Sequence, residues 1–346
     1  MLGAGHYCRS SIGRVTWRAT GIAFVDCRLL RLSFSTNSSN NHNVHCVNLV
    51  KEKDYPSYLT GLLLPNDVKR SYFAINAFNI ETSIIKEALR GGVNANKTPA
   101  KKRIGWWREA IEEAYEGNVS DQKMQQPVVK ALVGAIEEKL LTRRFFEHII
   151  DAREDDLEVS QRSSVEDVEE YGDKTFSSLL KLCLEAADVR SDGPDHVAAH
   201  LGRAMAIATA IRSAEALART KGEIAIPQSL MRSFEVPSKT LLEPMAVPIE
   251  KTSNDNQKLS EAVFEFATSG NSHLEHARDY FKTIDAGLQK QSHGIFLRCL
   301  QTSQLYEVFE ETNFDVFDPR LGATKRGIDS LPVQMLKAKF MSSSPF

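Results

Sequence analysis

The sequence is poor in cysteine and has no long apolar run. Five cysteines occur in 346 residues, widely spaced and without a Cys-x-x-Cys pair. This spacing speaks against a disulfide scaffold and a zinc ribbon and favours a reducing compartment. The longest apolar stretches, Leu62–Leu64 and Ala204–Ile211, are far shorter than the ~18–20 residues that cross a bilayer. We therefore expect no transmembrane helix.

Neither sign of charge is in excess over the whole chain. The 43 basic and 45 acidic residues give a formal net charge of -2, which lacks the basic footprint of a nucleic-acid-binding protein. No G-x-S-x-G, P-loop or G-x-G-x-x-G motif occurs, so hydrolase, nucleoside triphosphatase and dinucleotide-binding functions have no support. With 42% hydrophobic residues, the chain is long enough for a sizeable core.

Residues 1–44 differ in charge from the rest of the chain. They hold five arginines, no lysine and one acidic residue, Asp26, and they are rich in Ser and Thr. Such an N-terminus is typical of a mitochondrial transit peptide. The alternative is a disordered N-terminal tail that carries no targeting signal. We predict that 1–44 is a mitochondrial transit peptide. The run Arg28-Leu29-Leu30 resembles a processing pattern that places maturation near Asn37 or Ser38.

The rest of the chain has helical periodicity and almost no alternating strand pattern. Proline and glycine mark helix ends, as at Pro65 and Gly222, and Ser163 with Glu166 has the spacing of a capping box. Helices are predicted over 65–88, 106–115, 127–151, 163–183, 196–220, 254–285, 294–311 and 332–340. Together they predict one all-α domain at 45–320 and a C-terminal tail at 321–346 with a short helix.

Two histidine pairs have spacings that metal sites use. His196 and His200 are four residues apart, and His273 and His276 are three apart, so each pair shares one face of a predicted helix. No glutamate follows His196, as a zinc protease motif requires. We interpret both pairs as capped or solvated histidines.

The order of several segments resembles the squalene/phytoene synthase family, from about Pro65 to Phe317. The segments that carry the resemblance are Ala74–Glu81, Trp107–Ile111, Tyr115–Gly117, Pro127–Leu132, Tyr171, Leu201–Ala204, Ile211-Arg212 and Gly222–Pro227. The resemblance implies an isoprenoid-synthase-like helical bundle around a central cavity. In the family's active enzymes, two aspartate clusters on facing helices bind Mg²⁺, which holds a prenyl diphosphate.

The aspartates of both clusters are largely absent here. The first cluster corresponds to Ser83, Ile84 and Glu87, and two aspartates of the second correspond to Ser213 and Leu217. Of five carboxylates, one is retained, as Glu87. The resemblance therefore implies a pseudoenzyme that keeps the fold and has no catalytic, cofactor-binding or metal-binding residues, and no cofactor.

Other stretches resemble a mitochondrial branch of the family that serves the assembly of respiratory complex I (NADH:ubiquinone oxidoreductase). They are Phe78–Glu81, Leu141–Arg144, Ile149–Glu154, His273–Arg278 and Asn313–Pro319. This resemblance implies an assembly factor that acts as scaffold or chaperone for a nascent subunit, with complex I intermediates or subunits as partners. It also implies a location on the matrix side of the mitochondrial inner membrane, with peripheral membrane association.

Two alternatives stay open on the sequence alone. An apolar central cavity could still hold an isoprenoid or other lipid, which needs no aspartates. Alternatively, the chain is an active prenyl-diphosphate transferase with relocated metal ligands in the acidic runs near Asp155 or Asp167. Acid-rich helix ends mainly complement the helix dipole, however.

Overall fold

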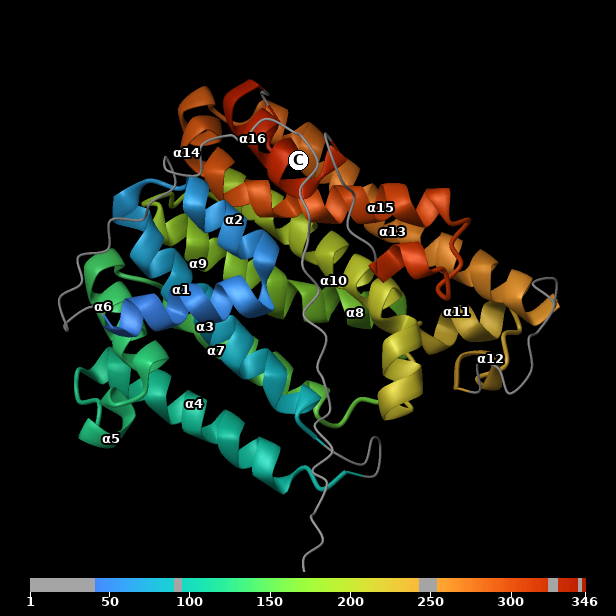
Figure 1. Ribbon diagram of the computed structural model, residues 1–346, viewed down its shortest axis with the longest axis horizontal. Coiled ribbons are helices and arrows are strands. Elements are labelled where there is room, and N and C mark those ends of the chain that lie inside the picture. The colour runs from blue at the N-terminus through green and yellow to red at the C-terminus, as the bar shows by residue number, and fades with distance from the viewer. Residues whose placement is uncertain (1–40, 90–94, 243–253, 323–328, 342–343) are drawn as a thin grey trace, which may run out of the picture. The chain divides into compact units, whose positions relative to one another are not determined.

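Helices make up all the regular structure in the parts of the chain that the structure describes (Figure 1). The computed structural model describes residues 41–89, 95–242, 254–322, 329–341 and 344–346. Within these ranges there is no β-strand, and no helix is long and apolar enough to cross a membrane. The all-α fold class predicted from periodicity is confirmed.

The helices follow one another with short connections. The first group is α1 (Asn41–Lys53), α2 (Tyr55–Leu63), α3 (Asn66–Glu87), α4 (Thr98–Glu116), α5 (Asp121–Met124), α6 (Pro127–Lys139), α7 (Arg143–Asp156), α8 (Val165–Gly172), the π-helical turn η4 (Asp173–Ser177) and α9 (Ser178–Ala186). The second is α10 (Asp192–Lys221), α11 (Gln228–Ser233), α12 (Lys239–Leu242), α13 (Asn254–Thr283), α14 (Ala286–Phe296), η5 (Leu297–Cys299), α15 (Leu300–Glu311), η6 (Pro319–Gly322) and α16 (Leu331–Met341).

Helix α3 is a core helix. Every residue from Ser71 to Ile80 is buried, as expected of a helix that other helices surround. Phe78 is fully buried and meets Trp107 of α4 and Phe146 of α7 edge to face, with ring centroids 5.4 and 5.2 Å apart. Offset and edge-to-face aromatic pairs add stability beyond the area they bury. The core is therefore built around the middle of α3.

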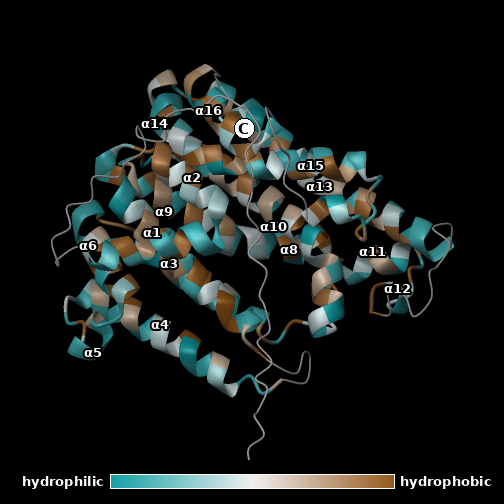
Figure 2. Ribbon diagram, viewed as in Figure 1, coloured by the Kyte–Doolittle hydropathy of each residue, from teal (hydrophilic) through white to brown (hydrophobic). Residues whose placement is uncertain are grey.

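Helices α10 and α13 form the longest packed pair. Small buried residues such as Ala204 and Ala208 line α10, which lets the neighbouring helices approach closely. Figure 2 shows apolar residues along α9 and α10, inside the bundle, and hydrophilic ones on outer faces such as that of α4. Gly222 ends α10 in the left-handed conformation, with φ of 67°, as predicted.

The helix predicted over 127–151 is two helices, so that prediction was wrong. Leu140 adopts the left-handed conformation, with φ of 50°, which ends α6 before α7 begins. The carbonyl oxygens of Lys139 and Leu140 accept hydrogen bonds from Arg190, at 2.7 and 3.0 Å, and Glu185 accepts one from the Thr142 amide at 2.8 Å. These distant partners hold a turn that apolar periodicity does not reveal.

Two other predicted helix positions differ in detail. The capping box uses Ser164 and Asp167 instead of Ser163 and Glu166, because the chain enters α8 one residue later. The helix predicted over 294–311 is the end of α14, the single 3₁₀ turn η5 and α15. In both regions the type of element was right and its boundary was not.

A close backbone approach joins the η4 segment to α10. A Cβ atom on Gly202 would lie 2.1 Å from Ser177 Oγ and 2.5 Å from its backbone nitrogen. Only glycine fits at that contact, since real Cβ contacts are rarely closer than about 3 Å. The contact brings the η4 backbone directly against α10.

Helix α1 begins at Asn41, inside the segment 1–44 predicted as transit peptide. Its Cys46 and Val50 are buried, and the helix packs against α3 and α6. Residues 1–40, which include the predicted cleavage region, lie outside the described residues. The boundary of the transit peptide therefore stays a prediction.

The C-terminal tail returns to the bundle. It carries α16, and its last residue, Phe346, is buried against Phe281 of α13 and Phe296 of α14, with ring centroids 6.0 Å apart in each pair. Arg278 donates a hydrogen bond to the Phe346 carbonyl oxygen at 3.3 Å. The tail thus contributes to the core of the bundle.

A buried ion pair connects the start of α2 to η5. Arg298 Nη2 lies 2.9 Å from Asp54 Oδ2, and Arg298 Nε donates to Ser57 Oγ at 2.5 Å. Burial by itself raises the pKa of Asp54, but the charge and hydrogen bonds of Arg298 outweigh it, so the pKa is lowered. Asp54 also caps α2 by accepting from the Ser57 amide at 3.1 Å.

Candidate functional site

A cavity of about 290 Å³ lies between the C-terminal halves of α3 and α10. The end of α7, α8, η4 and the loops at 159–162 and 223–225 complete its walls. The residues that contribute to it are spread over more than 140 positions of sequence, from Ser83 to Ala225. Packing of α3 against α7 and of α8 against α10 brings them together.

Four of the five positions assigned to metal-binding aspartates line this cavity. They are Ser83 and Glu87 on α3 and Ser213 and Leu217 on α10, so the two motif positions lie on facing helices as the resemblance implies. Ile84 is not among the lining residues.

The side chains at these positions do not form a ligand set for Mg²⁺. Ser83 Oγ donates to the Ile80 carbonyl at 2.9 Å, and Ser213 Oγ donates to the Thr209 carbonyl at 2.8 Å, so both hydroxyls bond to their own helices. Glu87 is exposed. Across the described ranges, no group of three or more His, Cys, Asp or Glu residues could hold a metal ion. Glu87 thus contributes the single carboxylate at these positions.

A lysine ammonium lies between two carboxylates of the cavity wall, Asp156 and Glu223. Lys86 Nζ lies 3.3 Å from Asp156 Oδ2 and 3.1 Å from Glu223 Oε2, and it donates to the Val159 carbonyl at 2.9 Å. Three oxygens from two separate segments, the end of α7 with the loop that follows it and the loop after α10, thus surround one ammonium group. Each carboxylate side chain is less than one fifth exposed, where an ion pair is stronger than at the surface.

Two arginines surround Tyr171 in the cavity wall. Arg162 forms an ion pair with Asp156 at 2.5 Å, and its guanidinium carbon lies 4.2 Å from the centre of the Tyr171 ring. Arg153 donates to the Tyr171 hydroxyl and, at 3.3 Å, to Asn79 Oδ1. Burial raises the pKa of Tyr171, so the phenol stays protonated and neutral at physiological pH.

The acidic runs considered for relocated metal ligands have other contacts. Asp167 accepts hydrogen bonds from the Ser163 and Ser164 amides, at 3.0 and 3.1 Å, as part of the cap of α8. Asp155 is exposed. Both residues line a smaller pocket of about 200 Å³ beside the cavity. Asp167 caps the start of α8, as expected where acidic residues complement a helix start.

The structure brings the two histidine pairs into one cluster between α10 and α13. His200 Nδ1 lies 2.9 Å from His273 Nδ1, so one of the two nitrogens carries the proton. The His196 and His276 rings lie 4.8 and 5.3 Å from the His200 ring. Burial and these neighbours lower the pKa of His200 to about 4. Sequence analysis treated the pairs separately because the pairing of α10 with α13 is not visible in the sequence.

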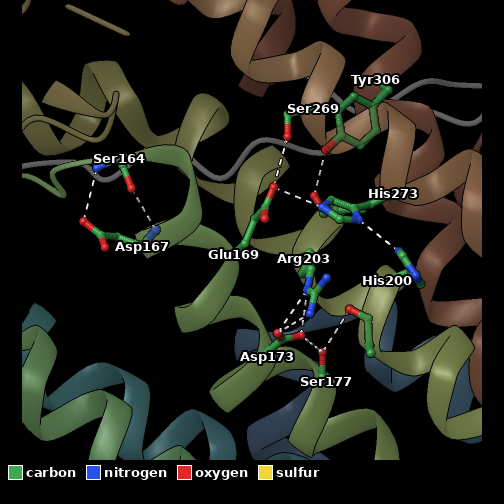
Figure 3. A network of polar contacts seen from close by, with 12 residues as sticks. Ser164, Asp167, Glu169, Asp173, Ser177, His200, Arg203, Ser269, His273 and Tyr306 are labelled. Atoms are coloured by element: carbon green, nitrogen blue, oxygen red, sulfur yellow. Dashed lines mark hydrogen bonds and ion pairs between the residues drawn. The ribbon is translucent and has the colours of Figure 1, made fainter. Parts of the chain in front are cut away.

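Two sets of polar contacts lie at the histidines, one around Glu169 of α8 and one around Asp173 of η4 (Figure 3). Glu169 Oε1 lies 3.0 Å from His273 Nε2 and accepts a hydrogen bond from Ser269 at 3.1 Å. Beside it, Arg203 donates to both carboxylate oxygens of Asp173. These contacts join α8 to α13, α13 to α10 and α10 to η4.

Sequence analysis missed the cations of the cavity. Lys86, Arg153, Arg162 and Lys221 belong to no motif. Arg153 does lie within Ile149–Glu154, one of the stretches that indicated the complex I branch, and this is the one signal that pointed to it.

Comparison of the sequence with known proteins identifies both a family and named relatives. Residues 50–327 match the squalene/phytoene synthase family model. The chain is 29% identical over 279 residues to "NADH dehydrogenase (ubiquinone) complex I, assembly factor 6" of Mus musculus. The aligned region covers 81% of this chain and 77% of the mouse protein. It is 30% identical over 271 residues to the Drosophila melanogaster homolog, covering 78% of this chain and 76% of that protein.

Enzymes of the family are also among the matches. The 15-cis-phytoene synthase of Synechococcus elongatus is 25% identical over 298 residues, covering 81% of this chain and 88% of the enzyme. A crystal structure of a dehydrosqualene synthase superposes with a TM-score of 0.67 at 17% identity, covering 87% of this chain and 95% of that one. For squalene synthase HpnC from Alicyclobacillus acidocaldarius the TM-score is 0.64 at 13% identity, with 80% and 95% covered.

The structural likeness confirms the predicted isoprenoid-synthase-like bundle, and the family model spans most of the chain. This chain belongs to the squalene/phytoene synthase family.

Proposed function

We propose that this protein is an assembly factor for respiratory complex I and that it does not transfer prenyl groups. Similarity to the named complex I assembly factors, over 81% of the chain for the mouse protein, supports the first part. The second part depends on one observation. Among the five positions of the metal-binding aspartates, Glu87 is the one carboxylate, and it is exposed.

The chemistry of prenyl transfer explains why this loss matters. Ionisation of an allylic diphosphate expels a multiply charged leaving group, and Mg²⁺ held by several carboxylates neutralises that charge. One exposed carboxylate cannot hold such an ion. Leu217 places apolar surface where the second cluster would bind it, and Asp156 and Glu223 are already paired with Lys86 and Arg162.

The proposed role is that of a folded scaffold or chaperone for a nascent complex I subunit. We place it in mitochondria, on the matrix side of the inner membrane, on the strength of the Arg-rich N-terminus and the relatives. Exposed Leu336, Phe340 and Met341 on α16, beside the exposed Lys337, support peripheral contact with the membrane.

Affinity purification from mitochondria tests the assembly role. Complex I subunits or assembly intermediates should co-purify with the tagged protein, and cells that lack the protein should show less assembled complex I on native gels. Normal complex I in such cells would contradict the assembly role.

A separate assay tests the loss of catalysis. The purified protein with Mg²⁺ and farnesyl or geranylgeranyl diphosphate should form no product, while a phytoene or squalene synthase run in parallel does. Steady product formation would overturn the pseudoenzyme proposal.

Binding of a lipid in the cavity is the second candidate function. The inner walls include Val168, Phe176, Ala210 and Leu217, and ligand pockets are mainly apolar with a few polar groups. Mass spectrometry of organic extracts from the purified protein tests this, and an extract free of any stoichiometric lipid would argue against it.

A further inference from the structure

A pair of aromatic rings lies at the surface where α13 packs beside the end of α15 (Figure 1). The Phe264 side chain of α13 is 51% exposed. Its ring meets that of Phe314, just after α15, edge to face with the centroids 5.0 Å apart. Neither ring lines the cavity. Aromatic side chains are enriched in protein interfaces and often dominate their affinity, so the pair is a candidate contact surface.

The backbone that places Phe314 is strained. Asn313 and Phe314 both adopt the left-handed conformation, with φ of 50° and 57°, which residues with a side chain rarely do twice in succession. The Phe314 amide donates to the Phe309 carbonyl at 2.8 Å, and Thr312 and Val316 on either side are buried. Such strain persists where neighbouring contacts enforce it, and it is concentrated at functional sites. Here it holds a partly exposed ring at the surface.

Carboxylates surround the two rings. Glu261 and Glu265 lie one turn before and directly after Phe264 on α13, and Glu310 lies on the last turn of α15. All three are exposed, and none forms an ion pair within the parts of the chain that the structure describes. Residues three and four apart on a helix share one face, so an exposed aromatic side chain and a carboxylate lie side by side on α13.

Two cations of these segments are already paired. Lys258 of α13 lies 2.9 Å from Glu235, and Arg320 of η6 lies 2.7 Å from Asp318. A negative rim around an apolar centre repels an anionic membrane surface. It complements a protein segment that carries an apolar side chain between Lys or Arg residues.

We infer that the Phe264 patch, formed by Phe264, Phe314, Glu261, Glu265 and Glu310, docks a basic segment of a partner protein. An apolar side chain of that segment lies against the two rings, and its Lys or Arg side chains lie against the carboxylates. The inference rests on the proposed assembly role for which proteins carry the segment, namely complex I subunits or intermediates. It adds the contact surface and the charge of the partner.

Fluorescence anisotropy of the full chain tests the inference with a labelled helical peptide that has leucines on one face and lysines on the other. The peptide should bind saturably in the micromolar range, and added salt should weaken binding because the contact is partly electrostatic. The same peptide with glutamate in place of every lysine should bind at least about tenfold more weakly. Equal binding of the two peptides, or no binding of the lysine peptide at near-millimolar concentration, would overturn the inference.

Variants distinguish the Phe264 patch from the rest of the surface. Phe264→Ser and Glu265→Lys should each weaken binding of the lysine peptide at least about tenfold, because each removes a central contact. The matched controls are Phe340→Ser on α16 and Glu138→Lys on α6, both at exposed positions, and they should bind like the unmodified chain. Unchanged binding in both patch variants, or equal losses in the patch variants and their controls, would contradict the location of the site.

Sedimentation velocity distinguishes a partner protein from a second copy of this chain, whose α16 presents exposed apolar residues beside Lys337. The unmodified chain should be a monomer, and a dimer that Phe264→Ser dissociates would overturn the assignment to a partner protein. Complex I levels in cells that lack the protein test the assembly role separately. Peptide binding without a complex I defect would contradict that role alone, and a complex I defect without peptide binding would contradict the docking site alone.

Discussion

At the scale of single residues, Glu87 tests whether the one retained carboxylate of the aspartate clusters still has a function. It is exposed and its carboxylate is the one retained from the aspartate clusters. Glu87→Gln removes the charge with little change in volume. Because a scaffold does not need this charge, complex I assembly should stay normal in cells that express only the variant. Native gels and immunoblots measure it, and lost assembly at normal protein abundance would show that the carboxylate is functional.

Phe78 should matter for stability where Glu87 does not. Its ring is fully buried between Trp107 and Phe146. Phe78→Ala should lower the free energy of unfolding by about 3–5 kcal/mol because it leaves a cavity in a packed core. Urea denaturation measures this. Phe340→Ala, at a ring that is 75% exposed, is the control, and equal losses in the two variants would contradict the assignment of the core.

His200 should make the protein sensitive to acid. Its folded pKa is about 4, lowered by burial and then by His273, His196 and Arg203, against about 6.5 in the unfolded chain. The folded state therefore binds this proton less readily, so stability falls as pH drops from about 6.5 towards 4. His200→Asn removes this contribution, and its denaturation midpoint should fall less between pH 7 and pH 5. Parallel pH profiles would show that His200 does not contribute.

The residues of the cavity show where sequence analysis reaches its limit. Ser83 and Ser213 could be placed because a resemblance fixed their positions, and both line the cavity. The ion pairs of Lys86 could not be predicted, because its partners Asp156 and Glu223 are 70 and 137 residues away in the sequence. Local sequence patterns do not predict which charged residues the fold will bring into contact.

At the scale of helices, proline and glycine residues predicted where helices begin and end. The sequence did not show which helices pack against one another. Pro127 and Gly222 mark the start of α6 and the end of α10 as predicted. The break at Leu140 was missed because partners far along the chain, Glu185 and Arg190, hold it. Local rules therefore predict elements better than they predict where tertiary contacts interrupt them.

Gly202 gives a test of how closely these helices approach. Gly202→Ala would place a methyl group against the Ser177 backbone, so it should cost about 1–3 kcal/mol by overpacking. Gly134→Ala is the matched control in α6, where a Cβ meets no other atom within 4 Å. The control should be neutral or stabilise the protein by up to about 1 kcal/mol. Thermal melting measures both variants. Equal shifts in the melting temperatures of the two would contradict the close approach at Gly202.

At the scale of the whole molecule, α1 should belong to the mature protein. Cys46, Val47 and Val50 are buried, and burial of each such side chain stabilises a protein by about 1.5–3 kcal/mol. A chain that starts at Asn41 should unfold at the temperature of the full chain, whereas one that starts at Asp54 should lose several kcal/mol. Circular dichroism measures both, and equal stability of the two would show that α1 is dispensable.

A separate measurement tests the transit peptide. N-terminal sequencing of the protein from mitochondria should find a start upstream of Asn41, near Asn37 or Ser38. A mature protein that still begins at Met1 would contradict the presequence, and one that begins inside α1 would contradict the role of that helix in the core.

The buried pair of Asp54 and Arg298 has a consequence for the order of events when the chain is made. A ribosome or an import channel delivers the polypeptide from its N-terminus, so Asp54 emerges early and its counter-ion follows 244 residues later. In the interval the carboxylate needs water, and the N-terminal helices cannot close over it. Contacts between such distant residues slow folding. We therefore expect the start of α2 to pack fully only after Arg298 has emerged.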